Sequence, residues 1–155
     1  MVDETLNAFL EGPVMMVAAA VSGDGRPVLA RALGARRVGG GLVELIVSRA
    51  QWPQAVAAMV SDAAMAFTFC RPHDYQTFQM KGDVVAARAA GADDLARARA
   101  YCERMTRELM GLGVQERQIA CWLCLEDLVC VSFRPRQAFR QTPGPNAGAR
   151  LESAL

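Results

Sequence analysis

The chain has 155 residues, of which 52% are hydrophobic and 21% are charged, so its length and apolar content suit one folded domain. Seventeen basic and sixteen acidic residues leave a net charge of +1, which provides no excess of positive charge for a nucleic-acid backbone or an anionic membrane surface. We therefore expect a small molecule or another protein as the partner, and neither nucleic acid nor a membrane.

The apolar segments are too short to cross a bilayer, since the best run covers only residues 14–21. The chain starts with Met-Val-Asp-Glu and lacks the basic and apolar regions of a secretory signal. These features predict a cytoplasmic protein. The five cysteines are an odd number in apolar surroundings, and we expect them to be reduced.

The first third of the chain predicts one helix followed by three antiparallel strands. Residues 3–11 carry apolar side chains at helical spacing behind an acidic first turn and stop at a Gly-Pro pair. Strands are expected at 14–21 and 27–33, because the turn at 22–25 places Asp-Gly between two apolar runs. A third strand is expected at 42–47, after three consecutive glycines.

The rest of the chain alternates between helical and extended patterns. Residues 52–60 have one apolar stripe and a proline at the start, which favours a short helix. Two strands are predicted at 63–70 and 75–88, and a last one at about 128–134.

The strongest helical pattern covers residues 93–112. Its predicted buried stripe consists of Leu95, Ala98, Cys102, Met105, Leu109 and Leu112. We expect the charged residues on its other side, including Arg97, Arg104 and Glu108, to be solvated.

This succession predicts a mainly β protein, a small antiparallel β-barrel with inserted helices. Residues 1–140 would form the single domain, and residues 141–155, which are rich in proline and glycine, a C-terminal loop tail. Barrels of this size bind ligands at their mouths or between subunits.

One strand carries a line of polar groups. Alternation from residue 75 places Thr77, Gln79 and Lys81 on the same face, and Lys81 is the only lysine of the chain. Hydroxyl, amide and ammonium groups in a row can bind the polar edge of a planar heterocycle. The alternative is a polar strand surface that faces solvent.

Two arginines are candidates for binding a phosphate. Arg31 lies between Leu29 and Leu33 on one strand face, so its guanidinium must find an anion or reach out of the sheet. Arg49 follows Ser48 at the start of the predicted short helix, where anions are favoured. The alternative for Arg31 is that its side chain reaches the rim of the sheet or pairs with a surface carboxylate, and Arg49 is the weaker of the two candidates.

Other residues with reactive side chains give weaker indications. Cys121 and Cys124 have the spacing of a redox dithiol or of half a zinc site, but the further ligands of a zinc site are scattered, so we predict no metal site. His73, the only histidine, lies in a loop, where it is either solvated or available as a proton donor or haem ligand.

The order of elements, the strand YQTFQMKGDVV and the tail FRQTPGPNAGARL together resemble the FMN-binding split-barrel family related to pyridoxamine (pyridoxine) 5′-phosphate oxidase, and in particular small members with a C-terminal QTPGP motif. The resemblance implies a six-stranded antiparallel split β-barrel with a short crossing helix and one long helix. It also implies a homodimer with FMN sites at the subunit interface. By position, Arg31 resembles the arginine that holds the phosphate, Thr77 and Gln79 resemble polar contacts to the flavin, and Lys81 lies on the same face.

Two departures from that family bear on activity. An Arg-Lys pair is expected after the third strand, whereas here Arg49 is followed by Ala50; the Arg-x-His stretch near the C-terminus of the vitamin oxidases is also missing. We therefore do not expect oxidation of pyridoxine phosphate. The residues and the resemblance together predict an FMN-dependent oxidoreductase acting on a small substrate, with catalytic residues unidentified. The alternative is a non-enzymatic split barrel that stores or senses flavin or haem, or that has lost its cofactor.

Overall fold

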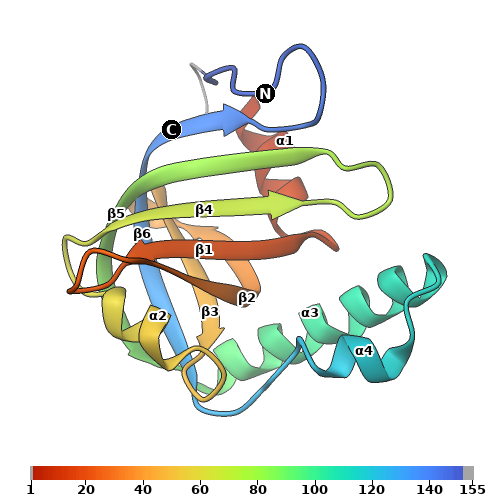
Figure 1. Cartoon of the computed structure of the whole chain (residues 1–155), viewed down its shortest axis with the longest axis horizontal. Coiled ribbons are helices and arrows are strands. Elements are labelled where there is room, and N and C mark those ends of the chain that lie inside the picture. Colours follow the sequence, from red (N-terminus) through yellow and green to blue (C-terminus); the bar gives the residue numbers. More distant parts are fainter. Residues whose placement is uncertain (1, 152–155) are drawn as a thin grey trace.

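The computed structural model describes residues 2–151, in which six antiparallel strands close into a barrel in the order β1-β2-β3-β6-β5-β4 (Figure 1). The strands are β1 (Met15–Val21), β2 (Pro27–Val38), β3 (Leu42–Ser48), β4 (Ala64–Cys70), β5 (Thr77–Ala89) and β6 (Leu128–Arg140). The helices of this part of the chain are α1 (Val2–Leu10), α2 (Pro53–Ala58), α3 (Ala92–Gly111) and α4 (Glu116–Ala120), and a 3-10 turn covers Gly39–Gly41. The predicted barrel with a short and a long helix is confirmed.

Alternation along the strands separates the core from the outer surface of the barrel. Met16, Ala18 and Ala20 of β1 are buried, whereas the residues between them are partly exposed. On β4 and β5 the inward side chains are larger and are also buried: Met65, Phe67, Phe69, Phe78 and Met80. These side chains fill the barrel, so a ligand must bind on its surface or at its ends.

Two strands extend beyond their predicted ends, each by means of a bulge. β2 continues past residue 33 because Gly34, with a φ of 127°, permits an irregular step in the pairing with β3. β6 continues past residue 134 because Pro135, which cannot donate a ladder hydrogen bond, lies opposite Gly82 at a second irregular step. A side chain at Gly82 would collide with the carbonyl oxygen of Arg134, so this position requires glycine.

The helices close and flank the barrel (Figure 1). Phe9 of α1 packs on Phe69 and Phe78, with ring centroids 5.8 and 5.0 Å apart, and so closes one end of the core. α3 packs beside β2 and extends past the barrel with α4 next to it. α4 was not predicted, because five residues are too few to show a helical pattern. Among the described residues, no helix combines the length and the hydropathy needed to span a bilayer.

The buried face of α3 differs from the predicted stripe. Asp94 and Tyr101 are buried, whereas Leu112 is about half exposed. Tyr101 donates a hydrogen bond from its hydroxyl to the carbonyl oxygen of Val14 at 2.7 Å, which ties α3 to the entry of β1. Burial of the ring raises the pKa of the Tyr101 phenol, so the hydroxyl stays a donor.

The chain after β6 folds back on the barrel. Residues 141–147 form the loop that their composition predicts, and the N–H of Gly148 then donates to the carbonyl oxygen of Arg140 at 2.8 Å. The N–H of Leu151 donates to the carbonyl oxygen of Ala138, also at 2.8 Å. Residues 148–151 therefore lie along the end of β6, and the last four residues of the predicted tail fall outside the described part.

Candidate functional site

The outer surface of β2, β1, β4 and β5 collects most of the predicted site residues. We call it the outer sheet face; its residues are Leu29, Arg31, Met15, Val17, Ala19, Val21, Ala64, Ala66, Thr68, Cys70, Thr77, Gln79 and Lys81. One row of paired residues crosses the four strands and consists of Arg31, Val17, Thr68 and Gln79. Three strand spacings separate the first and last backbones of this row, a distance of about 14 Å.

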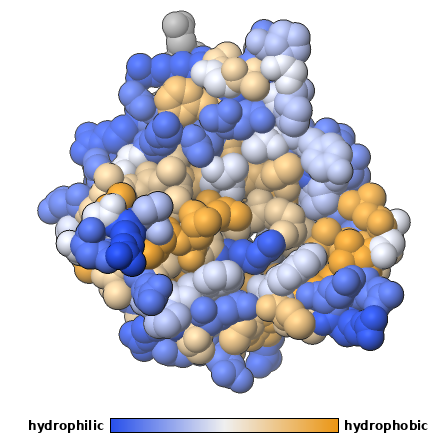
Figure 2. Space-filling model, in the orientation of Figure 1, coloured by the Kyte–Doolittle hydropathy of each residue, from blue (hydrophilic) through white to orange (hydrophobic). Residues whose placement is uncertain are grey.

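The centre of the outer sheet face is apolar and open. Figure 2 shows hydrophobic residues gathered over β1 and β4, with hydrophilic residues around them. Val21 of β1 and Leu29 of β2 lie on the same face at diagonal positions of paired strands and are both 57% exposed, which is unusual for large aliphatic side chains. A groove of about 460 Å³ runs from this apolar area to Lys81 and Gln137. The groove thus offers an apolar wall with polar groups at one end.

Arg31 lies at the β2 end of the face with its charge uncompensated. Its guanidinium carbon is 5.0 Å from the centre of the Trp122 ring, and Nη1 is 3.8 Å from the sulfur of Met15. Among residues 6–151, no carboxylate is within ion-pair distance of Arg31. A guanidinium that is packed on an aromatic ring and lacks an anion suits a phosphate ligand.

Gln79 and Lys81 lie at the β5 side of the face. The Gln79 amide nitrogen donates to the hydroxyl of Thr68 at 2.9 Å, so the amide oxygen is left as an acceptor. The Lys81 ammonium lies 5.1 Å from the centre of the Phe139 ring and has no carboxylate partner among the described residues. Thr68, which fixes the Gln79 amide, and Trp122, which supports Arg31, were not predicted as site residues. The role of Thr68 depends on the register between β4 and β5, and that of Trp122 on a loop far along the chain.

Thr77 shares the face, but its polar groups bind the chain itself. Its hydroxyl donates to the carbonyl oxygen of Tyr75 at 2.8 Å, and its N–H donates to the hydroxyl of Thr142 at 3.1 Å. The N–H of Gln141 in turn donates to the carbonyl oxygen of Thr77 at 2.8 Å. Gln141 and Thr142 begin the QTPGP motif, so Thr77 anchors that motif to β5.

Arg49 lies apart from the other four predicted residues. It follows β3 and makes two hydrogen bonds to the carboxylate of Asp127, at 2.8 and 2.7 Å. Its side chain lines a different groove, between α2 and the second half of β5. The carboxylate hydrogen bonds raise the pKa of Arg49 and lower that of Asp127, as expected of a stable ion pair.

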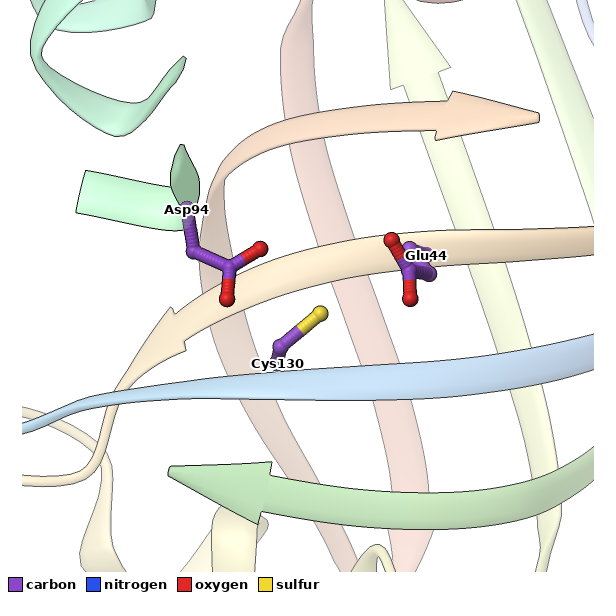
Figure 3. Close-up of side chains that lie close together, drawn as sticks. All are labelled: Glu44, Asp94 and Cys130. Atoms are coloured by element: carbon purple, nitrogen blue, oxygen red, sulfur yellow. The ribbon is translucent and has the colours of Figure 1, made fainter. Parts of the chain in front are cut away.

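A second polar cluster lies between α3, β3 and β6. Figure 3 shows Glu44, Asp94 and Cys130 close together, and their ligand atoms all lie within 4.8 Å of one another. Both carboxylates are nearly buried, with 13% and 3% of the side chains exposed. Burial raises the pKa of the Cys130 thiol and therefore favours its neutral form.

Both carboxylates of this cluster accept hydrogen bonds from arginines. Arg36 donates to one Glu44 oxygen from two nitrogens at 3.0 and 2.9 Å. Arg88 and Arg97 each donate to Asp94 at 2.5 Å, and Asp94 also accepts from the N–H of Gly91 at 2.8 Å. These hydrogen bonds, of which the one from Arg88 has the largest effect, hold the pKa of the Asp94 carboxyl group well below its usual range. The oxygens that a cation would need are thus engaged by guanidinium groups, so the cluster is an ion-pair network.

Arg97 is therefore part of this network and is only about a quarter exposed, so the prediction that it lies on a solvated face was wrong.

The other reactive residues are dispersed. His73 Nδ1 lies 2.7 Å from a Glu108 oxygen, which links the β4–β5 loop to α3. Cys121 is exposed, and its thiol donates to the carbonyl oxygen of Arg117 at 3.3 Å. Among the described residues, neither Cys121 nor Cys124 belongs to a group that could hold a metal ion.

Comparison with known proteins bears on the fold. No family model matches the sequence, and no curated protein sequence matches it. The solved structure of HupZ from Group A Streptococcus superposes with a TM-score of 0.56 and 13% identity, over 96% of this chain and 100% of that one. An F420 reductase superposes with a TM-score of 0.55 and 18% identity, over 85% of this chain and 94% of that one. At these identities the likeness shows a shared fold, and this is the barrel fold that the sequence resemblance implies.

Proposed function

We propose that the outer sheet face binds FMN and that the protein is a flavin-dependent oxidoreductase acting on a small substrate. The observation that carries this proposal is a pair of cations, Arg31 and Lys81, which have no carboxylate partner among the described residues and lie at opposite sides of an open apolar sheet surface. A flavin is itself an apolar ring system with a polar edge and a phosphate tail, so its chemistry matches that distribution. The shared fold with an F420 reductase supports a redox cofactor of flavin type.

The residues on the face fit separate parts of such a cofactor. Arg31 would hold the phosphate through charge-assisted hydrogen bonds, with Trp122 keeping the guanidinium in place. Gln79, oriented by Thr68, would accept from a ring N–H through its free amide oxygen. Lys81 would stabilise negative charge on the ring. When bound, the flavin supplies the hydride or electron transfer, and the protein supplies position and electrostatics.

A homodimer is part of the same proposal. Val21 and Leu29 are each more than half exposed on the outer sheet face, and exposed apolar side chains on the same face of a sheet favour contact with another protein surface. A second copy seated there would cover the apolar centre and exclude water from the cofactor. Light scattering tests this point, because a monomeric mass in the presence of FMN would contradict it.

The cofactor site is tested by titrating cofactor-free protein with FMN while following flavin and tryptophan fluorescence. Replacing Arg31 with Ala should weaken binding by about 1.5–3 kcal/mol through loss of a charge-assisted bond. Arg99→Ala is the matched control, because Arg99 is exposed on α3, outside the outer sheet face. Equal affinity of wild type and Arg31→Ala would refute the role of Arg31.

Haem is the second candidate ligand, because the Nε2 of His73 makes no hydrogen bond among the described residues, with a carboxylate oxygen of Asp74 3.9 Å away, and the ring lies beside an open cleft with Arg104 and Arg107. A haemin titration distinguishes the two ligands. If haemin binds and FMN does not, and His73→Ala abolishes the haemin signal, the haem alternative replaces the flavin proposal.

A further inference from the structure

A cavity of about 290 Å³ lies between α3 and the second half of β2. Three of its lining side chains are arginines: Arg36 from β2, and Arg97 and Arg104 from α3. None of its lining residues belongs to the outer sheet face, so the cavity is separate from the proposed flavin site. The cavity lies next to the ion-pair network of Glu44 and Asp94, because Arg36 and Arg97 belong both to that network and to the lining of the cavity.

The arginines of the cavity have hydrogen-bond donors that the protein does not use. One terminal nitrogen of Arg97 donates a hydrogen bond to Asp94, whereas its Nε and its other terminal nitrogen are buried without a partner among the described residues. The Nε of Arg104 is also buried without a partner among the described residues, and a terminal nitrogen of Arg104 makes only a long hydrogen bond, 3.4 Å, to the backbone oxygen of Glu11. Buried donors without acceptors are costly, and an oxyanion in the adjacent cavity would supply acceptors.

The charge around the cavity favours an anion. Glu44 and Asp94 share three arginines, so that network alone has one positive charge in excess. Arg104 adds another positive charge, and the one acidic residue in the lining is Glu11, which is exposed at the rim. The network, Arg104 and Glu11 together hold four arginines and three carboxylates, so one positive charge remains uncompensated. The forked geometry of a guanidinium group fits carboxylate and phosphate groups in particular.

The rest of the lining limits the size and character of the ligand. Leu10, Met16 and Tyr101 provide an apolar wall, and the hydrogen bond from Tyr101 to Val14 fixes its ring. The volume is at the lower end of the range for ligand pockets, which suits a small metabolite better than a nucleotide.

We propose that this cavity binds a small organic anion, whose carboxylate or phosphate group is held by Arg97 and Arg104 and whose apolar part lies against Tyr101. The site is independent of flavin binding.

The test is calorimetric titration of the full chain with succinate and, separately, with inorganic phosphate, at constant ionic strength. We expect at least one of these probes to bind, and the one that binds identifies the preferred head group. Arg104→Gln should weaken that binding by about tenfold or more, because a charge-assisted contact is lost. Arg99→Gln, which removes the same charge from an exposed position on the same helix, should leave it unchanged.

Ala100→Leu provides a second variant that keeps every charge but fills the cavity, since Ala100 lies in its lining. Thermal melting confirms that each variant is folded. The proposal is overturned if neither probe binds, if Arg99→Gln weakens binding as much as Arg104→Gln, or if folded Ala100→Leu binds with wild-type affinity.

Discussion

Replacing Asp94 with Ala removes the acceptor that organises the start of α3. The Asp94 side chain is only 3% exposed and accepts hydrogen bonds from Arg88, Arg97 and the N–H of Gly91. The variant leaves two guanidinium groups without their carboxylate and one helix N–H without its acceptor. Arg97 is the more buried of the two arginines, so it has less access to water as a substitute.

The expected loss follows from these contacts. A hydrogen bond to a charged group contributes about 1.5–3 kcal/mol net, and removing one partner of a buried ion pair costs about 3–5 kcal/mol. The bonds to Asp94 share one carboxylate and are not additive, so we expect the free energy of unfolding to fall by about 3–5 kcal/mol. For a chain of this size that corresponds to a fall in Tm of roughly 6–20 °C.

Urea denaturation of wild type, Asp94→Ala and Asp93→Ala measures this difference. Asp93 is the matched control, because it is exposed in the same helical turn and its removal costs only the interaction with the helix dipole, about 0.3–1 kcal/mol. If Asp94→Ala is no more destabilising than Asp93→Ala, the ion-pair network does not stabilise the fold.

Three further predictions concern stability. The folded-state pKa of Asp94 lies below its unfolded value, so its contribution is present above about pH 4 and is lost as the pH falls; the stability difference between wild type and Asp94→Asn, measured by denaturation at a series of pH values, should therefore shrink in acid. An unchanged difference down to pH 2 would contradict this assignment. Tyr101→Phe should cost about 1–3 kcal/mol in the same assay, because it leaves the buried carbonyl of Val14 without its donor, and an unaltered urea midpoint would show that water replaces it. Gly82→Ala should cost about 1–3 kcal/mol or prevent folding because its Cβ meets the backbone of β6, whereas Gly39→Ala, which meets nothing, should melt like the wild type.

Local sequence patterns predicted most of the fold. The Asp-Gly turn, the alternation in β1, β4 and β5 and the long apolar stripe of α3 each depend on neighbours in the chain, so they can be read without the structure. The extensions of β2 and β6 could not be predicted, because Gly34 and Pro135 normally interrupt strands and are accommodated here by pairing with other strands.

The candidate site was predicted in part for the same reason. Strand alternation is local, so Thr77, Gln79 and Lys81 were correctly placed on one face, and the structure adds Arg31 to that surface by strand order. The partners of individual groups are set by tertiary contacts. The ion pair of Arg49 with Asp127 and the engagement of Arg97 by Asp94 involve residues whose charges look like ordinary surface charges in the sequence.

Titration of cofactor-free wild-type protein with FMN, with haemin in a parallel titration, tests whether the outer sheet face is a flavin site. We expect micromolar or tighter FMN binding, accompanied by quenching of tryptophan fluorescence, since Trp122 supports Arg31 at the edge of the face. Absence of FMN binding by folded protein would show that the outer sheet face is not a flavin site and would leave the barrel as a binding protein for another ligand.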